Sequence, residues 1–356
     1  GDSLVIYRDT EEEIQFLSIV NGTFQVSASH FPNHYVEEVA FSANSFLASN
    51  PYPHDGYGTI TASPKDSSGD IMSKTMSIAP GDVDARAAFG TSISVDGDVL
   101  VVGAPNDADG AGSAFIYRQT ETFTWLEEAK LVPEDSSVQS FGNSVLVKNN
   151  VVIVAADNSG DASEGAVFMW GFDSSTKSWQ KLVNNTLVND DCDGHFGYSL
   201  ALTSDDGLLI GCPLSNDDAG SVYYYQSDND GLGLGTIFRY KLKQKITAKN
   251  GGSLEKFGRN NHHLAVNSHG DVVAIGTYGR LSGLNEKVYI LAKFENVWKE
   301  VAKIDAPKDS LYFGSDIVIS GDRILIVSWK NVHSYVFTCV DIDQEQQLSS
   351  NNNSDV

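Results

Sequence analysis

The chain has 356 residues, and its 24 lysines and arginines against 47 aspartates and glutamates give a net charge of −23. A chain of this length can bury a large core, and 41% hydrophobic with 20% charged residues excludes a disordered or collagenous protein. Phosphate binding requires a basic surface, so we expect no nucleic acid partner.

No run of about 18 apolar residues could span a bilayer, so we expect no transmembrane segment in this chain, and residues 1–4 lack the regions of a signal peptide. The tripeptides that begin at Asn21 and Asn184 fit the acceptor pattern for N-glycosylation. These two tripeptides favour a secreted, cell-surface or luminal protein.

The sequence repeats itself, and the dipeptide Phe-Gly marks each copy. Five copies follow one another at spacings of 52 to 61 residues, which is the length of a four-stranded propeller blade. The marker pairs are Phe89-Gly90, Phe141-Gly142, Phe196-Gly197, Phe257-Gly258 and Phe313-Gly314.

In chain order, residues 1–30 come first, and their stretch DSLVIYRDTEEEIQFLSIV matches the third and fourth strands of the later copies. We expect these strands to complete the last blade and so to close the ring without an exposed sheet edge. Complete blades then begin near residues 36, 89, 141, 196, 257 and 313. Residues 341–356 have no periodicity and are predicted to be a polar linker or a disordered tail.

Each copy has the same order of strand signals. An alternating stretch after Phe-Gly leads through a short polar turn to an apolar run such as DVLVVGAP or VVIVAAD, which predicts a hairpin whose second strand is buried on both faces. Two more strands follow. We therefore predict an all-β fold over residues 1–340, a β-propeller of four-stranded antiparallel blades, with seven blades favoured and six as the alternative.

The pattern Phe-Gly-x-Ser, a short turn and Gly103-Ala104-Pro105 resembles the FG-GAP repeat family, which forms the head of integrin α-subunits. The short first turns are closer to the protist and bacterial variants of the family. The resemblance implies a structural role for the motif: Phe fills the space between adjacent blades, Gly permits a close backbone approach, and Pro ends the second strand.

Calcium is the one ion for which the sequence offers a candidate site. The integrin relatives bind it between the first and second strands, but those turns are too short here. Asn189-x-Asp191-x-Asp193-Gly194 supplies alternating oxygen ligands, although Leu200 stands where the closing carboxylate would be. This stretch is therefore either a calcium site or an ordinary Asp-Gly turn.

One face of the predicted propeller is acidic. Loops that lead into first strands and loops that leave second strands lie on the same face, because successive strands reverse direction. Solvated loops and a docking surface for a cationic partner or divalent ions are both consistent with this charge. The acidic residues assigned to this face are Asp82, Asp84, Asp107, Asp109, Asp157, Asp161, Asp217 and Asp218.

Two further features stand out near the fourth copy. Cys192 precedes Phe196 and Cys212 ends the paired strand, so the hairpin could bring them together as a disulfide or leave two free buried thiols. In residues 239–245 four cations alternate with other residues, which would place them on one face of a strand, either to protect an edge or to bind a partner.

We found no nucleophile elbow, zinc motif or phosphate loop in the sequence. We therefore predict a non-catalytic module, extracellular or luminal, that binds a protein or glycan through loops on one face. We expect it to be part of a longer chain or of an assembly. The alternatives are a calcium-dependent adhesion or assembly subunit like the integrin head, and a propeller hydrolase with a metal at the acidic rim.

Overall fold

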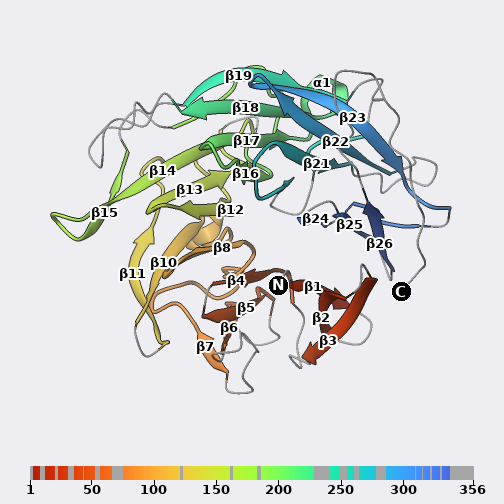
Figure 1. Cartoon of the computed structure of the whole chain (residues 1–356). Helices are drawn as coiled ribbons and strands as arrows, with labels where there is room; N and C mark the ends of the chain where they lie inside the picture. Colours follow the sequence, from red (N-terminus) through yellow and green to blue (C-terminus); the bar gives the residue numbers. More distant parts are fainter. Residues whose placement is uncertain are drawn as a thin grey trace. The chain divides into compact units, whose positions relative to one another are not determined.

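The structure, a computed structural model, contains seven antiparallel sheets in the part of the chain that it describes (Figure 1). It describes residues 36–42, 44–52, 57–65, 75–120, 123–160, 163–182, 186–227, 240–248, 255–259, 264–277, 286–308, 310–314, 316–320, 323–328 and 331–336, and the backbone of 3–8, 13–20 and 23–30. Residues 1–161 with 167–182 form one compact unit, and residues 162–166 with 183–356 form another.

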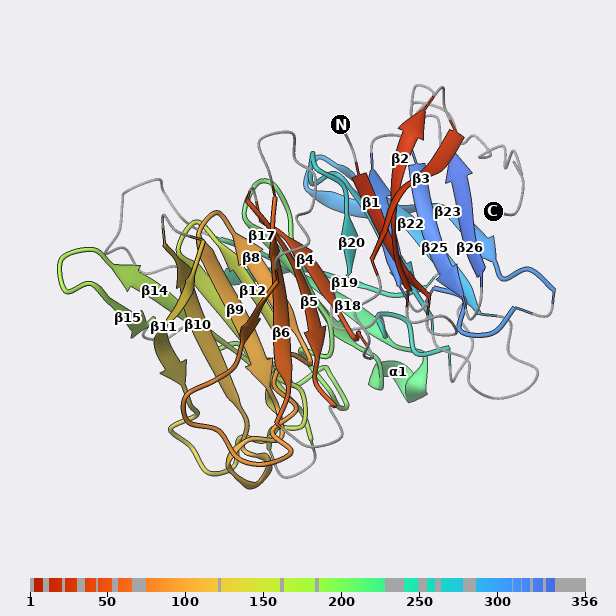
Figure 2. The same cartoon turned by 90° about the horizontal axis from the view of Figure 1, so that it is seen from below.

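The first unit holds four sheets, and each is hydrogen-bonded in chain order. Figure 2 shows β8 to β11 side by side in one of them. The strands of the four sheets are β1 (Ser3–Arg8), β2 (Glu13–Val20) and β3 (Thr23–His30); β4 (Val39–Phe41), β5 (Ser45–Asn50), β6 (Thr59–Pro64) and β7 (Met76–Ile78); β8 (Ile93–Asp96), β9 (Val99–Ala104), β10 (Ser113–Gln119) and β11 (Trp125–Leu131); and β12 (Phe141–Lys148), β13 (Val151–Ala156), β14 (Ala166–Asp173) and β15 (Ser178–Lys181).

The second unit holds three sheets. Two short helical turns also occur in the described chain, Ala108–Gly110 in the first unit and α1 (Ser215–Asp218) in the second. The strands of the three sheets are β16 (Leu200–Leu202), β17 (Gly207–Cys212), β18 (Ser221–Ser227) and β19 (Tyr240–Ile246); β20 (Ala265–Val266), β21 (Val272–Gly276), β22 (Lys287–Phe294) and β23 (Val297–Asp305); and β24 (Ile317–Ser320), β25 (Arg323–Ser328) and β26 (Asn331–Val336).

In four of the sheets the second strand is buried along its whole length, as the sequence predicts. Every residue of β5, β9, β17 and β21 is buried. Outer strands differ: in β23 exposed residues alternate with covered ones. The apolar runs therefore lie in the middle of sheets that are covered on both faces.

The Phe of each Phe-Gly pair packs against aromatic rings on the third strand of its own sheet. Phe141 lies with its ring centroid 5.6 Å from both Phe168 and Trp170, and Phe196 lies 5.9 Å from Tyr223 and 6.2 Å from Tyr225. Because alternate residues of a strand share a face, these two rings flank the Phe.

In four of the Phe-Gly pairs the Phe N–H also donates to a backbone carbonyl of a residue earlier in the chain. The N–H of Phe141 donates to the carbonyl of Ala111 at 3.0 Å, and a Cβ on the following Gly112 would lie 2.2 Å from the carbonyl oxygen of Phe141. Only glycine fits such an approach. The same pairing recurs at Phe89 with Tyr57, Phe196 with Glu164 and Phe257 with Ala219.

The fifth junction uses a carboxylate where the others have glycine. Glu286 directly precedes β22, as Gly112 precedes β10, and its Oε2 accepts the N–H of Phe313 at 2.5 Å. Glu286 is buried. A side chain thus replaces the backbone carbonyl as the acceptor.

The outer strands carry a bulge at a fixed place. Pairing to the fourth strand shifts register after the fourth residue of β10, β18 and β22, which leaves Glu128, Lys243 and Val301 without an opposite residue. The pairing of β2 with β3 shifts at the same place, between Phe16 and Leu17.

This shared bulge corrects our assignment of the N-terminal strands. β2 has the bulge pattern of a third strand, so β1 and β3 stand as second and fourth strands, whereas we expected residues 3–20 to be a third and a fourth strand. β1–β3 form one three-stranded sheet and β24–β26 form another. Thr23 pairs with Val20, and the Asn-Gly between them in the sequence is a strong hairpin signal. That residues 1–30 complete the last blade stays a prediction.

Candidate functional site

The candidate site is the set of loops that lead into first strands or connect second strands to third strands, which we call the loop face. In the second unit it includes residues 186–198 and 213–220. In the first unit it includes residues 79–92 and 105–112. Each unit has a loop face of its own, and the two are described separately.

The acidic residues predicted for this face divide by exposure. Asp82, Asp84, Asp109 and Asp217 are exposed, and Asp218 is partly buried. Asp161 lies outside the described residues. Asp107 and Asp157 are buried, so they do not belong to the exposed acidic surface that we predicted.

Asp107 is buried because it organises its own loop. Its carboxylate accepts a hydrogen bond from Ser113 Oγ at 2.5 Å and from the N–H of Asp84 at 2.9 Å, and it pairs with Lys130 Nζ at 3.0 Å. Burial alone would raise the pKa of Asp107, but these hydrogen bonds and the lysine charge outweigh it and hold the pKa below its ordinary value.

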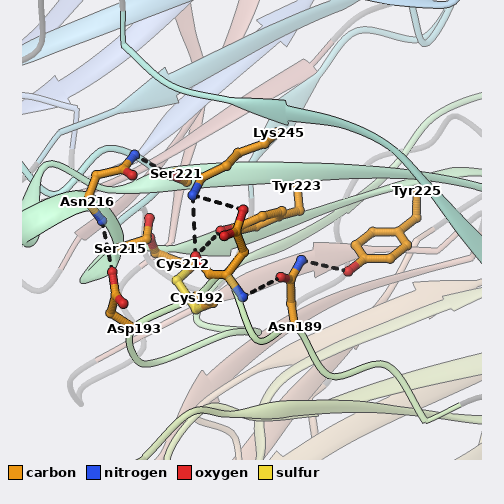
Figure 3. Close-up of polar contacts among 11 residues, drawn as sticks. Asn189, Cys192, Asp193, Cys212, Ser215, Asn216, Ser221, Tyr223, Tyr225 and Lys245 are labelled. Atoms are coloured by element: carbon orange, nitrogen blue, oxygen red, sulfur yellow. Dashed lines mark hydrogen bonds and ion pairs between the residues drawn. A yellow bond between two sulfur atoms is a disulfide. The ribbon is translucent and has the colours of Figure 1, made fainter.

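In the second unit a disulfide fixes the loop face. Cys192 and Cys212 are joined with their Cα atoms 6.1 Å apart, and both are buried. The bridge ties residues 189–195, which we call the stapled loop, to the end of β17. Figure 3 shows the polar contacts around it.

The stapled loop contains the three residues of the calcium prediction, and each has a protein partner. Asn189 Nδ2 donates to Tyr225 Oη at 3.1 Å, and Asn189 Oδ1 accepts the N–H of Asp191 at 3.0 Å. Asp193 Oδ2 accepts the N–H of Asn216 at 3.1 Å (Figure 3). Within the described residues no group of three or more His, Cys, Asp or Glu is arranged to hold a metal. The calcium site stays a prediction.

Lys245 links the stapled loop to the outer strand β19. Its Nζ lies 3.3 Å from Asp191 Oδ2 and 5.5 Å from the centroid of the Tyr223 ring, while Tyr223 Oη donates to the carbonyl of Asp191 at 2.6 Å. Burial would lower the pKa of Lys245, but contacts with Tyr223 and Asp191 outweigh it and raise the pKa. The lysine therefore stays charged.

The two tyrosines of this cluster are held protonated. Burial is the main cause that raises the pKa of Tyr223, against a hydrogen bond with Lys245 that lowers it. Burial likewise raises the pKa of Tyr225 to about 12, against the hydrogen bond of Asn189. Neither hydroxyl can act as a general base near neutral pH.

Beside the stapled loop, α1 is a left-handed turn. Asn216, Asp217 and Asp218 have φ values of 54°, 54° and 65°, a conformation that Asn and Asp tolerate better than other side chains. Asn216 is held at both ends, since its N–H meets Asp193 and its Nδ2 donates to Ser221 Oγ at 3.0 Å. The turn presents the exposed Asp217 from a fixed backbone.

Sequence reasoning missed Tyr223, Tyr225 and Lys245 as parts of this site. The available signals were the Tyr-x-Tyr spacing, which puts both rings on the face of Phe196, and the register that places Lys245 opposite Tyr223. The expectation of cations on one face of residues 239–245 is wrong for the described part: the bulge at Lys243 breaks the alternation, so Lys241, Leu242 and Lys243 are all exposed. Asn21, Asn184 and Arg239 lie outside the described residues.

Comparison with known proteins agrees with this geometry. Residues 72–117 match the family model of the FG-GAP repeat. Two solved structures of candidate 6-phosphogluconolactonases are similar: that from Bacteroides uniformis ATCC 8492 has a TM-score of 0.67 at 11% identity over 98% of this chain and 95% of its own. That from Bacteroides fragilis NCTC 9343 has a TM-score of 0.63 at 11% identity over 98% and 92%.

A hypothetical selenium-binding protein from Sulfolobus tokodaii is similar over 82% of this chain and 73% of its own, with a TM-score of 0.53 at 10% identity. At such identities the likeness concerns the fold. In the described part of the chain, no helix has the length and apolar character needed to cross a membrane. The prediction of a β-propeller is confirmed: the chain has an all-β propeller fold of antiparallel sheets, and residues 72–117 carry an FG-GAP repeat.

Proposed function

We propose that this protein is a non-catalytic interaction module, extracellular or luminal, that binds a protein or glycan through its loop face. The stapled loop is the observation that carries the proposal. Its polar groups hold one another in place, so the exposed carboxylates of Asp190 and Asp217 project from a backbone fixed before binding. Such preorganisation lowers the entropy cost of association.

The chemistry of the stapled loop supports binding over turnover. Tyr223, Tyr225 and Lys245 have pKa values moved away from neutrality, whereas general acid–base catalysis favours groups that titrate near the working pH. The FG-GAP repeat of residues 72–117 is also a structural motif. The disulfide suits an oxidising compartment.

The test compares two sets of substitutions. D190N with D217N removes charge from the loop face of the second unit, and D271N with D206N removes it at the turns between first and second strands. Binding to a glycan array and to a panel of extracellular proteins should fall in the first pair and persist in the second. Equal loss in both pairs, or unchanged binding in both, contradicts the proposal.

Two other functions have direct assays. The names of two similar structures make hydrolysis of 6-phosphogluconolactone the enzyme activity to measure, with and without a chelator. Turnover that D190N and D217N abolish would replace the interaction proposal by a hydrolase. Calcium-dependent adhesion requires calcium binding, so calorimetry without heat and an unchanged melting temperature would eliminate it.

A further inference from the structure

The positive charge of this acidic protein is concentrated in one stretch of sequence. Residues 239–308 hold 13 lysines and arginines against 6 aspartates and glutamates, a net charge of +7. Since the whole chain carries −23, the remaining residues carry −30. This asymmetry is larger than solubility requires, because a solvated surface needs only interspersed charges.

In the structure this stretch begins and ends with two outer strands of the second unit, β19 and β23, which are neighbours. The Gln244 side chain of β19 donates through Nε2 to the carbonyl of Trp298 and accepts its N–H through Oε1, both at 2.8 Å. Trp298 belongs to β23, so the two strands lie side by side (Figure 1). Six exposed residues of these strands form what we call the cationic rim, beside the exposed Lys241 and Asp305: Leu242, Lys243, Val297, Lys299, Val301 and Lys303.

Three other lysines of this stretch are held in ion pairs. Lys245, Lys287 and Lys293 are paired with Asp191, Glu255 and Asp205. The lysines of the cationic rim are exposed, although Lys303 Nζ lies 3.8 Å from Asp305 Oδ1, and Lys243 occupies the bulge, where a strand re-aims a side chain. The same place in β11 holds the triplet Leu126, Glu127 and Glu128, all exposed. One scaffold therefore carries opposite charges on different outer strands.

Apolar side chains lie among these lysines. Leu242 is 48% exposed, Val297 46% and Val301 37%. Edge protection accounts for the lysines but not for exposed aliphatic groups beside them, which would favour aggregation at an edge. A partner that offers both carboxylates and apolar side chains would cover both.

We propose that the cationic rim binds an extended acidic polypeptide segment in which Asp or Glu alternate with aliphatic residues. A sulfated glycan matches the charges but leaves Leu242, Val297 and Val301 uncovered. An anionic membrane is a wide plane that would also face the acidic remainder of the protein, whereas charges more than about 8 Å away are screened from a narrow segment. This surface is separate from the loop face.

The experiment measures binding of a labelled peptide of alternating Glu and Leu by fluorescence anisotropy. We expect saturable binding that weakens with salt, falls about tenfold in K243Q with K299Q, and falls several-fold in L242S. The matched control is K177Q with K308Q, which removes two exposed lysines elsewhere and should bind as the unmodified protein does. Gln in place of Glu in the peptide should abolish binding.

Heparin and phosphatidylserine vesicles are the competing probes. Tighter binding of either one, lost in K243Q with K299Q, would overturn the assignment of a polypeptide partner. Equal weakening in the control pair, or no binding of any probe, would overturn the surface itself. D190N with D217N should leave peptide binding unchanged, so failure here and failure of the loop-face proposal are distinguishable.

Discussion

Gly103 and Gly142 meet back to back between neighbouring sheets of the first unit. A Cβ on Gly103 would lie 1.8 Å from the carbonyl oxygen of Gly142, and one on Gly142 would lie 2.4 Å from the carbonyl oxygen of Ser113. Gly142 also has a φ of +94°. The glycine of Gly-Ala-Pro and the glycine of the next Phe-Gly therefore contact each other, which explains why both belong to the motif.

This contact predicts that Gly142→Ala unfolds the protein more easily. The added methyl meets backbone and the conformation disfavours side chains, so we expect a loss of about 3 kcal/mol or more in the free energy of unfolding. Gly97→Ala is the control, because Gly97 also has positive φ but has nothing within 4 Å, and it should cost about 1 kcal/mol. Equal losses in urea unfolding would contradict the contact argument.

The disulfide should stabilise the fold and the stapled loop together. The bridge closes a sequence separation of 20, for which chain entropy predicts roughly 3 kcal/mol. Replacing Cys192 and Cys212 by Ser should lower the melting temperature, measured by calorimetry, and should increase hydrogen exchange at residues 189–195. Cys339→Ser, with the bridge intact, is the control. An unchanged exchange pattern would show that the loop does not depend on the bridge.

Asp107 predicts a specific loss of stability in acid. Since its pKa is lower folded than unfolded, its contribution is complete above its unfolded pKa of about 3.9 and is lost as the pH falls through the folded pKa. Asp107→Asn should remove this loss from the pH profile and should destabilise at pH 7 by about 1–3 kcal/mol, because Lys130 loses the nearer of its two carboxylate partners. Asp109→Asn, at an exposed neighbour, should leave the profile unchanged.

The burial of Phe141 predicts how much its ring contributes to the free energy of unfolding. The ring is fully buried, with 0% exposure, so Phe141→Ala should cost about 3–5 kcal/mol, measured by denaturant unfolding. Phe123→Ala removes an equal ring that is 41% exposed and should cost under about 1 kcal/mol. A small loss at Phe141 would mean that its ring is not the wedge between the sheets.

The sequence alone predicts the features that repeat. The Phe-Gly spacing and the apolar second strands are enough to predict the blades, because the same packing recurs in each copy. It does not predict features in which one copy departs from the rest. Glu286 stands at a glycine position because its carboxylate reaches Phe313, and only coordinates show that contact.

Bulges are hidden for a related reason. An extra residue in an outer strand alters no motif, so Lys243 looked like part of an ordinary alternation. The N-terminal strands were assigned by the likeness of SLVIYR to the third strand AFIYR, and a short apolar run fits either the second or the third position. Asn189, Asp191 and Asp193 have partners in β18, in β19 and in α1, which lie later in the chain, and spacing within the loop does not reveal them.

The bulge of the outer strands also bears on how this architecture could be modified. Residues 126–128 and 241–243 are equivalent exposed triplets of opposite charge. The strands that pair with them, β10 and β18, both carry aromatic residues. The same place in the fold thus accepts opposite charges, although Glu128 also pairs with Arg118 at 2.6 Å. New binding specificities could therefore be introduced by substituting these triplets one at a time while the rest of each sheet is left unchanged.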